Sequence, residues 1–362
     1  MDETLRVGLI GYGYAGKTFH APLIAAVPGL RLATVASSDP ARVRADWPDM
    51  PVEPSPEALI ARPDLDLVVV ATPNDTHAPL ASRALAEGRH VVVDKPFTIT
   101  ADEARALRDQ AAAAGRLLAV FHNRRWDADF LTLRRLIERG ELGEVVAFES
   151  RFDRYRPAVR ARWREQTGPG SGVWYDLGPH LLDQALRLFG PPEAIWADLA
   201  AQRAGAVTDD YFHVQLRYGP LRAILHASML APAAGPRFVV HGTRGSYVKR
   251  GLDPQEDALR AGARPPRAGW GEDPRPGELT VWAGEAAETR ALPSLPGDYP
   301  AFYAAVRDAI LGHGANPVPP EEAIAVMELI ELARRSADER RELPYAPGRP
   351  DADAPSRPAQ AP

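Results

Sequence analysis

Three glycines near the start of the chain have the spacing of a phosphate-binding turn. Gly11, Gly13 and Gly16 lie in the segment GYGYAG, directly after the first apolar run. With this spacing, the first glycine permits a tight turn, the second lets a pyrophosphate approach the backbone, and the third allows a helix to pack closely on a strand. The free N–H groups and the dipole of that helix favour an anion. We therefore predict a dinucleotide site, with Tyr14 and Ala15 also in contact with the cofactor.

The end of the second apolar run should decide which nucleotide binds. Rossmann domains that select NAD usually carry an acid there, which accepts both ribose hydroxyls. In the segment TVASSDP, Ser37 and Ser38 occupy this place, and Asp39 follows one or two residues late. Serine hydroxyls can donate to a 2′-phosphate, and Arg42 and Arg44 could add positive charge, although each could equally be a solvated helix-face charge. The sequence predicts NADP as the cofactor, with NAD as the alternative.

A single lysine follows the fourth apolar run, in the segment VVVDKPFT. Lys95 stands between Asp94 and Pro96, at the carboxyl end of a predicted parallel strand, where sheets of this kind bind ligands. The chain has three lysines against forty arginines, which suggests that an ammonium group is needed at this place. An ammonium group there can stabilise the charge of a developing alkoxide. We predict a catalytic role for Lys95, with Pro96 beside the cofactor.

The segment WYDLGPHLLDQAL combines one imidazole with two carboxylates. Asp176, His180 and Asp183 are spaced i, i+4 and i+7, which puts them on one face of a helix. Carboxylates can hold a histidine in one tautomer, and a histidine can take up a proton near neutral pH. The same set of groups could also bind a metal ion. Because a redox cofactor is predicted elsewhere, we favour acid–base catalysis and predict no metal.

Weaker candidates follow other apolar runs, and simple packing or surface charge is an even alternative for each. The residues that follow the third run should lie near the nicotinamide, and these are Thr72, Pro73, Asn74 and His77. The residues that could line a polyol pocket follow the fifth run or lie in an arginine-rich segment, where aromatic rings could stack on C–H groups and arginines could meet hydroxyls. These residues are His122, Asn123, Arg124, Arg154, Tyr155, Arg156 and Trp163.

The elements that must position these residues divide the chain into two domains and a tail. Over residues 1–122, apolar β-branched runs alternate with helical patterns, which predicts a doubly wound parallel sheet, the Rossmann arrangement. The runs are 5–10, 30–37, 67–71, 90–93 and 117–121, and the helices are 78–87 and 101–114. Thr100 and Glu103 form a capping box at the start of the second helix, and Gly88 and Gly115 follow the two helix ends.

Over residues 123–346 the regular alternation of strands and helices ends, and several strand-like runs follow one another. This pattern predicts an α+β domain with a large open, mostly antiparallel sheet. Its expected strands are 145–151, 194–201, 211–218, 221–228, 237–241 and 245–249, and its expected helices are 129–139, 174–188, 299–311 and 320–335. The stretch 253–275 is rich in Pro, Gly and Arg and is predicted to be a surface loop. Residues 347–362 have too few apolar side chains to fold and are predicted to be a disordered tail.

Composition excludes several classes of protein. The net charge of −5 argues against a nucleic-acid partner, and the absence of cysteine excludes disulfides and thiolate metal sites. No apolar run is long enough to span a bilayer, so no membrane association is expected. The first residues lack the pattern of a secretory signal. We expect a cytoplasmic protein.

Taken together, these motifs resemble the Gfo/Idh/MocA oxidoreductase family over roughly residues 4–345. The shared marks are GYGYAG, ATPNDTH, a turn of the E-K-P type and a helix of the form D-x-G-x-H-x-x-D. The segments FHAPLI, FHNRRWDADF, DRYRP, ARWRE and QEDALRAG resemble the branch that contains NADP-dependent scyllo-inositol dehydrogenases. The turn departs from the family pattern, because Asp94 replaces the usual Glu. Ser38 stands where relatives often have Arg.

The resemblance implies a role for each matching residue. Lys95 would orient the substrate hydroxyl, His180 would act as the acid–base, and Asp176 would bind substrate hydroxyls and orient the histidine. The implied reaction interconverts a secondary alcohol of a cyclitol or sugar and its ketone by hydride transfer to NAD(P). The alternatives are an aldose or deoxy-sugar oxidoreductase, transient oxidation during glycoside cleavage on a tightly held nicotinamide, and a non-catalytic NADP(H)-sensing protein. A homodimer or homotetramer formed through the second sheet is expected.

Overall fold

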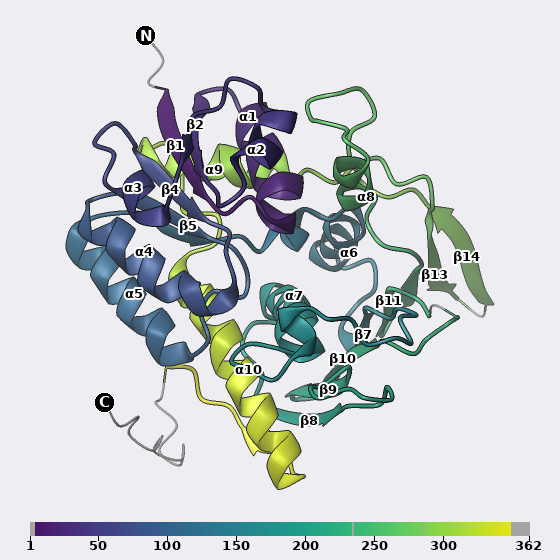
Figure 1. The fold of residues 1–362 in the computed structure, drawn as a ribbon. Coiled ribbons are helices and arrows are strands. Elements are labelled where there is room, and N and C mark those ends of the chain that lie inside the picture. Colours follow the sequence, from purple (N-terminus) through teal and green to yellow (C-terminus); the bar gives the residue numbers. More distant parts are fainter. Residues whose placement is uncertain (1–3, 234, 285, 349–362) are drawn as a thin grey trace.

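A computed structural model of the protein describes residues 4–233, 235–284 and 286–348, and two sheets organise it (Figure 1). The first sheet has six parallel strands in the order β3-β2-β1-β4-β5-β6, which is the predicted Rossmann arrangement. Four of its strands are apolar and almost wholly buried, as expected where helices cover both faces. The strands are β1 (Leu5–Ile10), β2 (Leu30–Ala36), β3 (Val52–Glu53), β4 (Leu67–Val70), β5 (His90–Val93) and β6 (Leu118–Val120).

Three helices of this half begin at a residue whose side chain caps them, namely Asp39, Ser55 and Thr100. The predicted capping box is confirmed, because Thr100 Oγ1 accepts from Glu103 N at 3.2 Å and Glu103 Oε2 accepts from Thr100 N at 3.1 Å. Gly115 ends the same helix with φ +60°. Two short helices and β3 were not predicted, since each is too short to show a period. The helices are α1 (Ala21–Ala26), α2 (Pro40–Asp46), α3 (Pro56–Ile60), α4 (His77–Ala86) and α5 (Ala101–Ala114).

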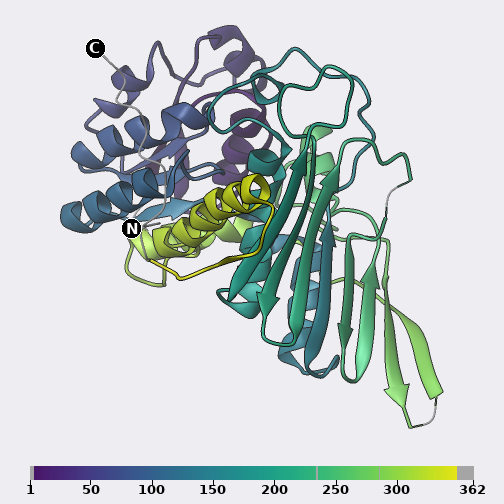
Figure 2. The ribbon, with the colours of Figure 1, turned by 90° about the horizontal axis from the view of Figure 1, so that it is seen from below.

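The second sheet has nine strands in the order β14-β13-β12-β11-β7-β10-β9-β8-β15. Only β7 and β10 pair in parallel, so the predicted mostly antiparallel sheet is confirmed. Figure 2 shows the helices on one face of this sheet, with α10 between the sheet and α5. The strands are β7 (Val145–Arg151), β8 (Ala194–Ala200), β9 (Tyr211–Tyr218), β10 (Leu221–Ser228), β11 (Phe238–Gly242), β12 (Gly245–Lys249), β13 (Gly277–Ala283), β14 (Ala286–Leu292) and β15 (Leu343–Pro344).

Two expectations for the second half need correction. The stretch 253–275, predicted to be a surface loop, contains helix α8 and several buried side chains, among them Asp253 and Gln255. Strands β13 and β14 were not predicted. For β14 the reason is that it is exposed along nearly its whole length and so lacks an apolar alternation. The remaining helices are α6 (Ala128–Glu138), α7 (Val173–Phe189), α8 (Gln255–Arg260), α9 (Pro300–Ile310) and α10 (Pro320–Glu339). Of the predicted tail, residues 349–362 lie outside the described residues.

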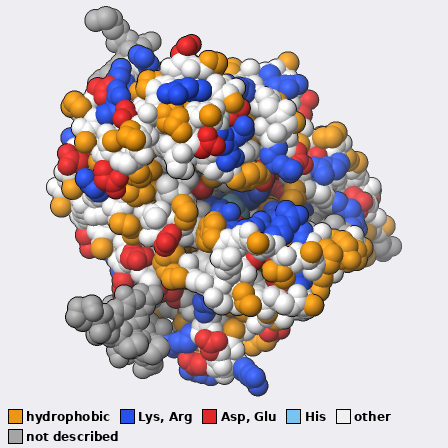
Figure 3. All heavy atoms as spheres, viewed as in Figure 1, with side chains coloured by type: hydrophobic (Ala, Val, Ile, Leu, Met, Phe, Trp, Pro, Cys, Tyr) orange, Lys and Arg blue, Asp and Glu red, His pale blue; other side chains and the backbone are white. Residues whose placement is uncertain are grey.

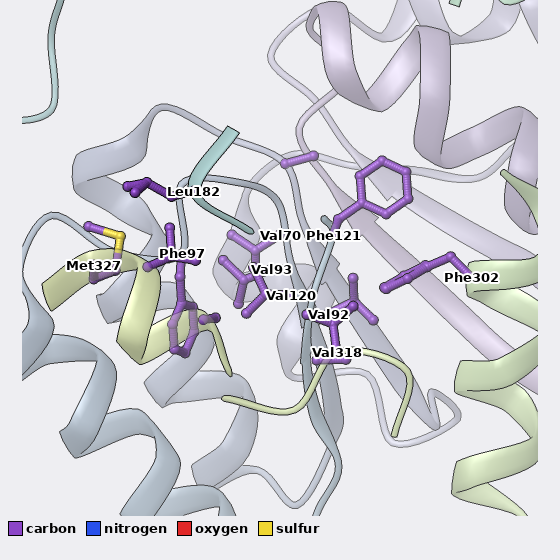
Figure 4. Close-up of a cluster of buried hydrophobic side chains, with 14 of the residues drawn as sticks. Val70, Val92, Val93, Phe97, Val120, Phe121, Leu182, Phe302, Val318 and Met327 are labelled. Carbon is purple, nitrogen blue, oxygen red and sulfur yellow. The ribbon is translucent and has the colours of Figure 1, made fainter. Parts of the chain in front are cut away.

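The last third of the chain returns to the first sheet. Helix α9 packs against α1, and Val120 N donates to Val318 O at 3.3 Å. Figure 4 shows the side chains of Phe302 and Val318 beside Phe121 and Val92, which belong to the first sheet. The buried side chains of both halves form one continuous hydrophobic cluster. The carboxyl ends of the parallel strands are therefore held in a fixed position relative to the helices of the second half.

Candidate active site

The three predicted glycines each have a physical reason for being glycine. Gly11 has φ +94°, and a Cβ at this position would collide with the carbonyl oxygen of Ala71. A Cβ on Gly16 would collide with the carbonyl oxygen of Gly11, so the helix can approach the turn only without a side chain. A Cβ on Gly13 would meet no atom within 4 Å, which means that this residue faces open space. The turn therefore has the form that a pyrophosphate requires.

That open space is part of a cavity of about 490 Å³, a volume typical of small-molecule and cofactor sites. The cavity extends from the glycine turn past the ends of β2 and β4 to the second half of the chain. The predicted cofactor residues on its wall are Gly11, Gly13, Tyr14, Ala15, Ser37, Ser38, Arg42, Thr72 and Pro73. Wall residues that were not predicted as cofactor contacts include Tyr12, Asp39, Ser55, Asp94 and Arg164. The residues around this cavity fit a dinucleotide.

At the end of β2, hydrogen bonds order the segment that should meet the ribose. Ser37 Oγ accepts from Asp39 N at 3.1 Å, and Asp39 Oδ1 accepts from Arg42 N at 3.0 Å, which caps α2. One carboxylate oxygen of Asp39 is thus engaged by the helix, although the residue also lies on the cavity wall. Arg44 is exposed and does not belong to the wall.

Four of the predicted cofactor residues lie behind the cavity wall. Gly16 and Pro96 are buried in the packing between helix and sheet. Asn74 Nδ2 donates to Gly170 O at 3.0 Å. His77 is fully buried, with Nδ1 2.8 Å from Pro96 O and Nε2 3.0 Å from Thr72 O. The imidazole of His77 therefore ties the end of β4 to the turn after β5, and it holds the wall in place without being part of it.

Lys95 and Asp176, which lie 81 positions apart, meet beside two residues of the cavity wall, Asp94 and Arg164. Lys95 Nζ, at the end of β5, donates to Asp176 Oδ1 at 3.0 Å and to Asp176 O at 2.7 Å, in the first turn of α7. Burial by itself would raise the pKa of Asp176. The positive charges of Lys95, Arg164 and Arg154 outweigh burial and lower this pKa, so Asp176 stays ionised. The structure thus brings together two of the three predicted catalytic residues.

His180 lies one helical turn beyond Asp176. Its ring is 6% exposed and is stacked with Phe152 at a centroid distance of 6.5 Å. Within the described part of the chain, Nδ1 has no hydrogen-bond partner. Burial, and after it the positive charges of Lys95 and Arg124, hold the pKa of His180 well below its usual value. The imidazole is therefore neutral at pH 7 and able to accept a proton.

The third member of the predicted helical set has another partner. Asp183 is buried and accepts from Arg125 Nε at 2.9 Å, and so forms an ion pair inside the protein. A buried ion pair of this kind costs several kcal/mol to break when one partner is removed. Asp183 belongs to the packing of α7 against the segment after β6, where it cannot also hold the His180 ring.

The predicted pocket residues after β6 are buried close to this centre. His122 is 2% exposed, neither of its ring nitrogens has a partner among the described residues, and burial lowers its pKa. Asn123 is also buried. Arg124 donates to Glu256 Oε2 at 2.7 Å, and its guanidinium lies 4.7 Å from the centroid of the Phe152 ring.

The two predicted aromatic pocket residues differ in position. Trp163 lies on the cavity wall, where the Arg164 guanidinium stacks on its ring at 4.7 Å. Tyr155 is 59% exposed and does not belong to the wall. Glu256 was missed, because the stretch that contains it was predicted to be a loop, yet its Oε1 accepts from Tyr14 Oη at 2.6 Å. The resemblance of the segment QEDALRAG to the family is the feature of the sequence that could have pointed to Glu256.

Two kinds of feature are absent from the described residues. No group of three His, Cys, Asp or Glu side chains there is arranged to hold a metal ion. No helix in residues 4–233, 235–284 and 286–348 combines the length and the apolar character needed to cross a bilayer.

Comparison with known proteins agrees with this geometry. The chain is 59% identical over 343 residues to the uncharacterized oxidoreductase YdgJ of Escherichia coli K12, with 95% of this chain and 99% of the relative covered. It is 42% identical to the scyllo-inositol 2-dehydrogenase (NADP⁺) IolW of Bacillus subtilis 168, with 94% and 96% covered. The solved structure of YPO2259 from Yersinia pestis matches with a TM-score of 0.92 and 56% identity, over 96% of this chain and 98% of that one.

Two family models match most of the chain. Residues 5–122 match the NAD-binding Rossmann fold of the oxidoreductase family, and residues 134–346 match the C-terminal alpha/beta domain of the same family. The two sheets follow the same division, with the first sheet within residues 5–122 and the second within residues 134–346. The chain belongs to the Gfo/Idh/MocA family of oxidoreductases.

Proposed function

We propose that this protein is an NADP-dependent oxidoreductase that interconverts a secondary alcohol of a cyclitol or sugar and its ketone. The observation that carries the proposal is the Lys95–Asp176 pair, with the neutral imidazole of His180 one helical turn away and Arg164 of the nucleotide cavity 3.6 Å from Asp176. The bound nicotinamide supplies the chemistry of hydride acceptance. The residues around the glycine turn would hold the pyrophosphate of the cofactor, and Thr72 and Pro73, at the end of β4, would lie near the nicotinamide.

Three side chains, those of Lys95, Asp176 and His180, bind the substrate and move its proton. In the oxidation direction the substrate loses a hydride from carbon and a proton from oxygen, and its C–O single bond becomes a carbonyl. His180 takes the proton, since its lowered pKa leaves it neutral. Lys95 donates to the same oxygen and stabilises the negative charge that develops there. Asp176 holds Lys95 and accepts from a substrate hydroxyl.

Three finer features are part of the proposal. NADP is preferred over NAD, because Ser37, Ser38 and Arg42 line the ribose end of the cavity and one oxygen of Asp39 is engaged as a helix cap.

The face of the second sheet that no described helix covers would bury itself against a copy, in a homodimer or homotetramer. A cytoplasmic location is proposed on the absence of cysteine.

The test is a panel of cyclic polyols and sugars with NADP⁺ and with NAD⁺, followed at the nicotinamide absorbance. Lys95→Ala and His180→Ala should each lower turnover by roughly 10²–10⁴-fold, the usual contribution of general acid–base groups, and should still bind NADPH. His313→Ala, which removes an exposed imidazole, is the matched control and should retain full activity.

Each outcome has a distinct meaning. Full activity of Lys95→Ala or His180→Ala would remove that residue from the mechanism. Equal efficiency with NAD⁺ would contradict the cofactor preference. If the wild-type protein turned over no alcohol and reduced no ketone on the panel with either nucleotide, the proposed function would be wrong.

A further inference from the structure

Three cationic side chains surround a single carboxylate at the substrate end of the cavity. Lys95 Nζ lies 3.0 Å from Asp176 Oδ1, and Arg164 Nε lies 3.6 Å from the same atom. Arg154 is near enough for its charge to lower the pKa of Asp176 as well. Asp176 is shared by Lys95 and Arg164, and Glu256, whose charge also acts on Arg154, is paired with Arg124, so neither carboxylate is reserved for Arg154.

Arg154 is the cation in this group that lacks a paired counter-ion. Three guanidinium groups lie over the ring of Phe152, those of Arg124, Arg154 and Arg237, at 4.7, 5.5 and 4.9 Å from its centroid. Arg124 has a carboxylate oxygen at 2.7 Å and Arg237 has one at 3.5 Å. For the side chain of Arg154, the described residues provide neither an ion pair nor a hydrogen bond, although it is partly buried and burial lowers its pKa.

The charge of Arg154 is permanent, because Arg cannot lose its proton. Its side chain is partly exposed, so it can meet a ligand that enters the site. A substrate hydroxyl can accept a hydrogen bond from Arg154 but cannot neutralise it. A carboxylate or phosphate group does both, and its oxygens match the planar guanidinium in a bidentate geometry. The charge pattern therefore fits an acceptor-rich, negatively charged ligand better than a neutral polyol.

The concentration of positive side chains is local. The chain as a whole carries a net charge of −5. Figure 3 shows Lys and Arg side chains gathered along the rim of the central hollow on this face. Such a concentration in a cleft raises the local concentration of anions and speeds their association.

We propose that the alcohol substrate carries an anionic substituent, a carboxylate or a phosphate ester, and that Arg154 binds it. This inference rests on the proposed function and narrows its substrate class. Arg164 and Trp163 lie on the wall of the nucleotide cavity, which places Arg164 beside the cofactor. Arg154 lies over the ring of Phe152, on which His180 also stacks, and we therefore assign Arg154 to the substrate. The neutral cyclitol named for the relative IolW then becomes the comparison substrate.

The first experiment compares matched substrates on the wild-type protein with NADP⁺. The panel contains a neutral hexose, its uronic acid, its 6-phosphate, and scyllo-inositol. The kcat/KM value for at least one anionic member should exceed that of its neutral parent by about 10- to 100-fold, the value of one charge-assisted hydrogen bond. The uronic acid and the phosphate ester then show separately which anionic group is recognised.

A binding measurement keeps the inference testable without turnover. Calorimetry on the NADPH complex should show tighter binding of the uronic acid or the phosphate ester than of the neutral hexose. Equal or weaker binding of both anions would overturn the inference. Turnover of the neutral members alone would also overturn it, but would leave the proposed function standing, whereas turnover of no member counts against the proposed function itself.

The second experiment uses variants of Arg154. Arg154→Gln should raise KM for the anionic substrate by about 10- to 100-fold more than it raises KM for the neutral substrate, and should leave the KM of NADP⁺ unchanged. Arg154→Lys, which keeps the charge, should recover part of the loss. Arg160→Gln removes an exposed charge from the same segment and should change nothing. If Arg154→Gln raised the KM of NADP⁺ instead, or affected neutral and anionic substrates alike, the assignment would be wrong.

Discussion

At the scale of single residues, the protonation state of His180 follows from its surroundings. The ring is buried, and the nearest charges that act on it, those of Lys95 and Arg124, are positive. Both effects favour the neutral imidazole, so the pKa lies well below the usual value for histidine. A neutral imidazole is the form that accepts a proton in alcohol oxidation. The environment therefore keeps His180 unprotonated at neutral pH, which is the form that its proposed role as a base requires.

This environment leads to a prediction for the pH dependence of the reaction. Because the pKa of His180 is lowered, kcat/KM for alcohol oxidation should stay level as the pH falls through about 6.5, the ordinary value for histidine, and should decline only at lower pH. The measurement is a pH profile of kcat/KM from about pH 5.5 to 9 at constant ionic strength, which spans that ordinary value.

A direct titration provides the control for this profile. The imidazole resonances of His180 can be assigned by comparison with His180→Gln and followed by NMR in the protein without substrate. They should not titrate near the ordinary histidine value of about 6.5. A resonance of His180 that titrates there or at higher pH would show that the surrounding charges do not act as the structure suggests.

At the scale of elements, α5 illustrates how a local signal stabilises a helix. The Thr100 hydroxyl accepts from Glu103 N, and the Glu103 carboxylate accepts from Thr100 N. The helix packs against α4 and α10, so its first turn supports contacts with both halves of the molecule. Thr100→Ala should lower the free energy of unfolding by about 1 kcal/mol, because it leaves a helix N–H without a partner.

Denaturant unfolding of the full chain measures this effect. Thr100→Ser keeps the hydroxyl and is the matched control, which should lie close to the wild type. A loss of stability in Thr100→Ser as large as in Thr100→Ala would mean that the methyl packing of the threonine, and not its hydrogen bond, is what matters.

At the scale of the whole molecule, α9 comes from near the end of the sequence but packs on α1 and on the segment after β6. Phe302 packs edge-to-face on Phe121, at a centroid distance of 5.0 Å, and on Trp126, at 5.6 Å. His20 Nδ1 and Tyr303 Oη lie 2.6 Å apart in the same buried region. Since the hydrophobic cluster runs through both halves, we expect them to unfold together.

The prediction at this scale concerns cooperativity. Phe302→Ala should cost about 3–5 kcal/mol, the usual effect of removing a buried aromatic ring, and should destabilise both halves together. Unfolding followed by circular dichroism and by tryptophan fluorescence should give coincident transitions in the wild type. Trp282→Ala, at a side chain that is 62% exposed, should change stability little. Two separate transitions in the wild-type protein would contradict the coupling.

Strands were predictable from the sequence where their pattern was regular. β1, β5, β7, β9, β10 and β12 have the bounds that the apolar runs predicted. β14 was missed, because an exposed edge strand has no buried face to produce an alternation. Helix α8 was missed, because the Pro and Gly residues around it mask six helical residues whose stability comes from tertiary packing.

The sequence by itself determined the types of chemistry in this protein. The glycine spacing, the rare Lys95 and the helical spacing of Asp176 and His180 are local patterns, and each is set by backbone geometry over a few residues. Only the tertiary structure decided which groups meet. Lys95 pairs with Asp176, 81 positions away in the sequence, and Asp183 pairs with Arg125. Long-range pairings of this kind depend on how the two sheets pack. The lack of a paired counter-ion for Arg154 among the described residues also depends on this packing, because burial and the distance to a counter-ion exist only once the chain is folded.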